Sequence, residues 1–209
     1  TTVVYYSDCT CPVEAHEAPA APAATEAPVA AEVPAAEGAL KTGLYIGTGI
    51  GDSTAATAEA DGTVKYDVTV VAVTVDEGGI IQDCRIDNIP ATLTFDASGV
   101  ITSDVSAPIL SKNELGDSYG MRKASSIGKE WNEQAAAIAA YAVGKKAADL
   151  GSIAISAAGE VDADLASGAT MYVGGFISAI QAAAENAQYL GAEAGDEAQG
   201  VVGEKGQQD

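Results

Sequence analysis

The sequence is poor in basic residues, with ten lysines and arginines against thirty aspartates and glutamates in 209 residues. The resulting formal net charge of -20 repels nucleic acid and anionic membrane surfaces. No basic stripe is left to bind phosphates along a nucleic-acid backbone. We therefore expect no nucleic-acid partner.

Long apolar runs are also missing. No stretch of about 18 apolar residues occurs, so the sequence predicts no membrane-spanning helix. The first residues lack the basic head and apolar run of a signal peptide, which indicates a mature chain. Aromatic residues make up only 5% of the sequence, while alanine, glycine, threonine and valine are abundant. This composition favours an extracellular or cell-surface protein.

Histidine is nearly absent, because His16 is the only one and it lies in a proline-rich segment. A histidine general base is therefore almost excluded, and with it most hydrolases that use a serine or threonine nucleophile. Acidic pairs are plentiful, yet no pair is marked as a glycosidase site. The sequence leaves open whether the protein is an enzyme, and favours a redox carrier over a catalyst with its own substrate.

Cysteine is scarce and its count is odd: Cys9, Cys11 and Cys84. Cysteines separated by one residue pair with each other only under strain, so we predict disulfides to another chain from these three residues. A metal site formed by Cys9, Cys11 and His16, with Cys84 as the fourth ligand, is an alternative. Free thiols at these cysteines are the third alternative.

The N-terminal region separates into two segments. Residues 12–40 contain five prolines, twelve alanines and five glutamates without a lysine or arginine, which predicts an extended linker. Residues 1–11 form an arm whose "VVYY" run has strong strand propensity but no partner strand nearby. We predict that a neighbouring copy accepts this arm as an added strand, so that the protein self-associates.

Residues 41–190 carry the pattern of one folded domain. Alternating residues in "TVKYDVTVVAVTV" predict a strand covered on both faces, and a Glu-Gly-Gly turn leads to a second strand from Ile80. "ATLTFDASGVITSD" predicts another hairpin with its turn at Asp96 to Gly99. The glycines of "GTGIG", residues 47–51, are expected to interrupt the side-chain pattern of a strand. A nucleotide-binding loop would require a helix after them, and none is predicted there.

Two amphipathic helices are predicted after the strands. The first begins near Ser126 and ends by Gly151, with one apolar stripe formed by Trp131, Ala135, Ile138 and Ala142. A short strand and turn follow in residues 151–164. The second helix spans residues 174–190, and its apolar side includes Phe176, Ile177, Ile180, Ala184, Ala187, Tyr189 and Leu190. Residues 191–209 form a polar tail. Strands first and helices later predict an α+β domain with helices packed on an antiparallel sheet.

The run "DLASGAT" ends with Thr170 at or just before the second helix. Backbone N–H groups at a helix start favour an anionic phosphate, and Gly168 and Ala169 leave room for a ligand. The residues alone favour a simpler role, in which Ser167 or Thr170 caps the helix.

This run resembles the D-x-x-S-G-A-T signature of the FMN-binding domain family, whose members include flavin-carrying subunits of sodium-translocating quinone reductases. The resemblance covers about residues 41–190. It implies that a flavin transferase attaches FMN through its phosphate to the hydroxyl of Thr170. It also implies that Asp164 belongs to the sequence that the transferase recognises, and that Ser167, Gly168 and Ala169 form a turn around the phosphate.

Two departures accompany the resemblance. Met171 and Tyr172 follow the threonine where the family often has a small hydroxyl residue, and residues 113–135 are similar to surface proteins of anaerobic Gram-positive bacteria. Four side chains are candidates to flank the flavin ring: Tyr119, Met121, Trp131 and Tyr172.

We expect an extracellular FMN protein that carries electrons to an unknown redox partner and forms filaments through its arm. The alternative is a cofactor-free filament or surface-layer subunit cross-linked by disulfides.

Overall fold

The computed structural model describes residues 38–156 and 159–193. The predicted arm, residues 1–11, and nearly all of the predicted linker lie outside these residues, as do Cys9, Cys11 and His16. Residues 194–209, most of the predicted tail, also lie outside them. Among the described residues, no helix has both the length and the apolar character needed to cross a membrane.

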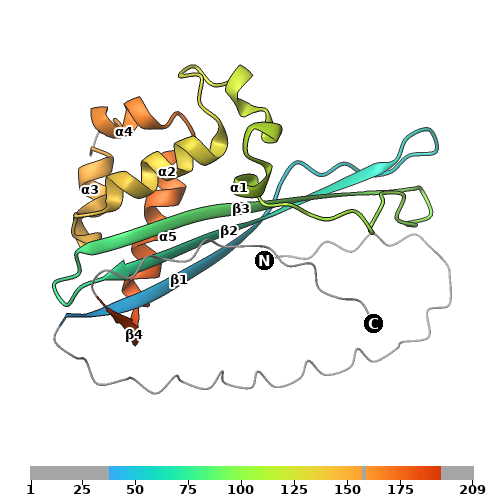
Figure 1. The fold of residues 1–209 in the computed structure, drawn as a ribbon. Coiled ribbons are helices and arrows are strands. Elements are labelled where there is room, and N and C mark those ends of the chain that lie inside the picture. The colour runs from blue at the N-terminus through green and yellow to red at the C-terminus, as the bar shows by residue number, and fades with distance from the viewer. Residues whose placement is uncertain (1–37, 157–158, 194–209) are drawn as a thin grey trace, which may run out of the picture. The chain divides into compact units, whose positions relative to one another are not determined.

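Four strands form one antiparallel sheet in the order β3-β2-β1-β4 (Figure 1). Their bounds are Ala39–Ile50 for β1, Gly62–Val75 for β2, Ile81–Phe95 for β3 and Gln188–Glu193 for β4. The β-branched residues of β2 fit this pleated surface. With helices following the first three strands, the prediction of an α+β fold is confirmed.

The turn between β2 and β3 lies where the sequence predicts it. Gly79 has a φ of 77°, which favours glycine, and its N–H bonds to the carbonyl oxygen of Asp76. The turn from Asp96 to Gly99 is also present. Its first arm, residues 91–95, is the end of β3, and its second arm pairs back only briefly. Ile101 bridges Phe95, and the N–H groups of Asp96 and Thr102 bond to the carbonyl oxygens of Val100 and Thr94.

Two longer helices pack on one face of the sheet, α2 (Trp131–Ala142) and α5 (Val173–Glu185) (Figure 1). They are the two main helices that the sequence predicts. The predicted stripe of α2 is buried in the core, with Trp131 3%, Ala135 2%, and both Ile138 and Ala142 0% exposed.

The predicted bounds of the first helix were wrong at both ends. The helix begins at Trp131, because Gly128 has a φ of 64° and the Ser125 hydroxyl accepts the N–H groups of Ile127 and Lys129 in a turn. It ends at Ala142, because the next residue is extended and Gly144 has a φ of 77°.

Shorter helices connect these elements: α1 (Lys112–Leu115), η1 (Gly116–Tyr119), η2 (Met121–Lys123), η3 (Ala147–Asp149), α3 (Leu150–Ala154) and α4 (Ala163–Gly168). The short strand and turn predicted in residues 151–164 are present only in part, because α3 occupies the start of that range and α4 begins at Ala163. Among the described residues of that range, one bridge from Ile155 to Val161 has strand character, and the Gly159 N–H bonds to the Ser156 carbonyl oxygen in a turn.

The second helix was predicted five residues too long at its end. It stops at Glu185, and Tyr189 and Leu190 belong to β4. Tyr189 pairs with Lys41 of β1, so pairing with a distant strand prevails over the local helical pattern. The folded domain therefore includes Ala39 at one end and Glu193 at the other, beyond the predicted limits of 41 and 190.

The sheet face opposite the helices carries an exposed apolar surface. β1 places Leu44, Ile46 and Ile50 on this face, opposite residues of β2 that alternate with the core valines. Val64, Tyr66 and Leu93 extend the row across β2 and β3. Exposed fractions range from 38% for Val64 to 77% for Ile50. We call these six residues the apolar sheet face.

Candidate functional site

Thr170 lies on an exposed connection between α4 and α5. It stands two residues before Tyr172, the N-cap of α5, which makes no side-chain capping bond. The predicted position just before a helix is therefore correct, whereas a capping role for Thr170 is not seen. Its side chain instead contacts α2.

Gln134 of α2 holds Thr170 in place. Its Oε1 atom accepts the backbone N–H of Thr170 at 2.8 Å and the hydroxyl at 3.3 Å. Gln134 is 0% exposed, so the hydroxyl proton points inward to a buried acceptor. The oxygen's lone pairs are consequently directed away from Gln134.

The four residues of the signature that precede Thr170 occupy α4 and its end. Asp164 and Ser167 are exposed, and the Ser167 hydroxyl donates to the carbonyl oxygen of Asp164 at 2.7 Å. Gly168 packs against α2, since a Cβ atom there would lie 2.8 Å from the Cβ of Ala137. Ser167 and Gly168 therefore end a helix and Ala169 is its buried C-cap, rather than a separate turn, and the expected contact of these residues with a phosphate stays a prediction.

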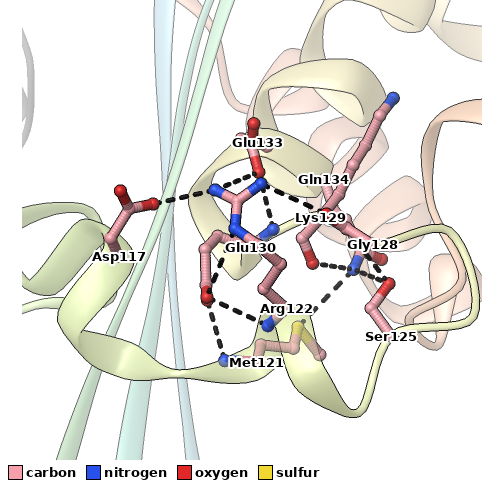
Figure 2. Close-up of polar contacts among 9 residues, drawn as sticks. All are labelled: Asp117, Met121, Arg122, Ser125, Gly128, Lys129, Glu130, Glu133 and Gln134. Atoms are coloured by element: carbon pink, nitrogen blue, oxygen red, sulfur yellow. Dashed lines mark hydrogen bonds and ion pairs between the residues drawn. The ribbon is translucent and has the colours of Figure 1, made fainter.

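Polar contacts join the start of α2 to the segment before it, as Figure 2 shows. The buried Glu130 carboxylate accepts the backbone N–H groups of Met121 at 2.8 Å and Arg122 at 2.9 Å. Arg122 also pairs with Asp117 at 2.8 Å and Glu133 at 3.1 Å. The hydrogen bond that the Arg122 guanidinium donates to the Asp117 carboxylate raises the pKa of Arg122, so this cation stays charged. The segment that precedes α2 is thereby fixed close to Gln134.

A cleft of about 390 Å³ borders the N-terminal end of α5. Gly47, Gly49, Asp67 and Asn88 line it from the sheet; α5 and its N-cap contribute Tyr172, Gly175 and Phe176. The first four residues of "GTGIG" belong to β1, as predicted, and its first two glycines also line this cleft. A Cβ atom at Gly47 would lie 2.6 Å from the Tyr45 hydroxyl, so a larger residue would crowd the space.

Asn88 is 3% exposed, and its amide orientation follows from its neighbours. Its Nδ2 atom donates to Asp67 Oδ1 at 2.9 Å and to Thr69 Oγ1 at 3.0 Å. A carboxylate only accepts, so the NH₂ group must face Asp67. This leaves Asn88 Oδ1 as a buried acceptor without a hydrogen-bond partner among the described residues.

The four candidate ring-flanking residues do not gather in this cleft. Only Tyr172, which is 83% exposed, lines it. Trp131 is buried and meets Phe176 edge to face, with 6.0 Å between ring centroids. Met121 packs on the core, and Tyr119 lies 5.1 Å from Lys112 Nζ.

Lys112 is the cation of the cleft lining. Its Nζ atom lies 5.1 Å from the centroid of Tyr119 and 5.2 Å from that of Trp131, so two rings position it. Sequence reasoning missed Lys112, Asn88 and Gln134. A signal existed only for Gln134, a polar side chain at helical spacing within the apolar stripe of α2.

Cys84 is buried in the core at 2% exposure, and burial raises the pKa of its thiol to about 12. This burial disfavours a disulfide from Cys84 to another chain, and that pairing stays a prediction. No group of three or more metal-ligating side chains occurs in residues 38–156 and 159–193. The predicted roles of Cys9 and Cys11 fall outside that range.

We predict that Cys84 resists modification in the native protein. In a Cys9→Ser, Cys11→Ser chain, a maleimide reagent should label Cys84 only after denaturant is added. The raised pKa also means that stability contributed by the neutral thiol is complete below about pH 9 and is lost as the pH rises toward 12. Rapid native labelling at pH 7 would contradict this placement.

Comparisons with protein-family models, curated proteins and solved structures found no match to the chain.

Proposed function

We propose that the protein is a flavoprotein that carries electrons through FMN bound covalently to Thr170. The observation that supports this most is the setting of the Thr170 hydroxyl. The residue is exposed, its hydroxyl is oriented by the buried Gln134, and it stands at the start of a helix that borders a cleft. Composition favours a cell-surface location for this carrier.

The cleft fits a flavin in size and chemistry. Its volume of about 390 Å³ falls within the range of small-molecule sites, about 300–1,000 Å³. Tyr172 and Phe176 offer aromatic surface, and two glycines of β1 leave space beside them. Asn88 Oδ1 is an unused acceptor suited to an N–H or hydroxyl donor. The first turn of α5, which has no side-chain cap, suits the phosphate.

The covalent step balances with a flavin dinucleotide as donor. A bond forms between Thr170 Oγ and the phosphorus of the FMN part, and the pyrophosphate P–O bond breaks. The nucleoside monophosphate leaves, and the hydroxyl proton passes to a base of the transferase. No oxidation or reduction occurs in this step.

The bound flavin would supply the redox chemistry, and the protein residues would orient it and set its electrostatic surroundings. Lys112 places a positive charge at the cleft, and the N-terminal end of α5 adds a partial positive charge. Both favour negative charge on a group bound there. Asp67 opposes them from the sheet side.

Flavin absorbance and intact mass test this proposal. Protein purified from a host that has the flavin transferase should be yellow and heavier than the bare chain by one attached FMN. A colourless, unmodified product from that host would contradict it.

A second candidate function is a cofactor-free filament or surface-layer subunit. The apolar sheet face favours it, because six large exposed apolar residues on one face are typical of an interaction surface. The arm of residues 1–11, with Cys9 and Cys11, would supply further contacts between copies. The two functions are compatible in one protein.

We predict that charge on the apolar sheet face weakens self-association. Ile46 and Ile50 are 60% and 77% exposed, so the double change to aspartate should leave the fold intact. Each lost apolar contact should weaken association by about tenfold or more. Analytical ultracentrifugation measures this, with Val105→Asp, at an exposed loop residue, as the control. Equal association of both variants would exclude this face as the interface.

A further inference from the structure

The most constrained atom near Thr170 is Gln134 Oε1. It accepts both polar hydrogens of the threonine, the backbone N–H at 2.8 Å and the hydroxyl at 3.3 Å. The Nε2 atom at the other end of the amide also has hydrogen-bond partners. Nε2 donates to the Lys129 carbonyl at 3.1 Å and to the Ser125 hydroxyl at 3.2 Å, as Figure 2 shows.

The amide cannot exchange its two ends without loss. A reversed amide would set NH₂ against the Thr170 N–H and its oxygen against the Lys129 carbonyl, so two hydrogen bonds would become repulsive contacts. Gln134 is 0% exposed, so water cannot compensate. The position of the acceptor oxygen is therefore fixed by α2 and by the residues before it.

We propose that Gln134 is a positioning residue that presents the Thr170 hydroxyl for flavin transfer; this inference rests on the proposed function. With its proton directed to Oε1, the hydroxyl turns its lone pairs outward to the incoming phosphorus. After the ester forms, the backbone N–H of Thr170 still donates to Oε1 and keeps the attachment point in place. Gln134 touches neither donor nor flavin, and acts only through Thr170.

Buried Glu130 fixes the segment before α2 that contacts the Gln134 amide. Its carboxylate fixes the backbone of Met121 and Arg122, and the Met121 sulfur lies 3.6 Å from Gln134 Nε2. The segment that Gln134 binds is thus held independently of Thr170. Ser178 is an exposed hydroxyl on α5, outside the contacts that hold Gln134, which makes Ser178→Ala the matched control.

The test uses the full chain, purified unmodified, with a purified flavin transferase and flavin adenine dinucleotide. Intact mass followed over time gives kcat and KM for transfer. We expect Gln134→Met to lower kcat about tenfold with little change in KM, because the exposed signature is unaltered. Ser178→Ala should stay within about twofold of the wild type.

A second measurement does not depend on the variants folding. In the unmodified wild-type chain, hydrogen exchange should show the Thr170 amide protected, although the residue is exposed. A folded Gln134→Met with wild-type kcat, or an unprotected Thr170 amide in the wild type, would overturn the proposal. A folded wild type that the transferase never modifies would instead overturn the proposed function.

Discussion

We expect Thr170→Val to remove the proposed covalent flavin completely. Valine matches threonine in shape but has no hydroxyl, so no phosphoester can form and the mass increment of FMN disappears. The Thr170 N–H still donates to Gln134, and the exposed site tolerates the methyl group, so folding should change by less than about 1 kcal/mol. Intact mass and visible absorbance measure the loss, and thermal unfolding checks the fold.

The control for this prediction is Ser178→Ala. Ser178 is an exposed hydroxyl on α5, the same helix that follows Thr170, and its loss should leave flavin content unchanged. A Thr170→Val protein that keeps a covalent flavin would mean that attachment occurs at another residue. The cleft beside α5 would then need another explanation.

Gly43→Ala should destabilise the domain more than other single changes to the sheet. α5 crosses β1 so closely that a Cβ atom at Gly43 would lie 1.9 Å from the carbonyl oxygen of Ala183. That oxygen is backbone and cannot rotate away, so helix and strand must separate. We expect a loss of about 3 kcal/mol in the free energy of unfolding, measured with urea.

Gly49→Ala is the matched control because Gly49 lies on the same strand and the same face. A Cβ atom there would meet the Asp67 side chain at 3.2 Å, and a flexible side chain can move. The change in unfolding free energy should stay below about 1 kcal/mol. Similar stability for the two variants would show that α5 does not pack against β1 as described.

The strands and the two main helices are readable from the sequence because their patterns are local. β2 alternates between two faces, and the stripe of α2 repeats at helical spacing. The predicted element bounds are wrong where contacts with residues far away in the chain determine the secondary structure. Tyr189 joins β4 because β1 offers a pairing edge, and no local pattern shows that edge.

The candidate site was predictable only in part. The signature located Thr170, but its surroundings come from segments far away in the chain: Gln134 on α2, Asn88 on β3 and Lys112 on α1. The small α4 was missed although Asp162 offers a capping side chain, because six residues carry little periodicity. The candidates to flank the flavin ring were chosen by residue type alone, and one of them, Trp131, is buried in the core.

The most direct test of the central claim is tandem mass spectrometry of the proteolytic peptide that contains Thr170. Protein from a host with the flavin transferase should give this peptide with one FMN, and fragmentation should place the phosphate on Thr170. An unmodified peptide, recovered together with a folded and colourless protein, would contradict the account.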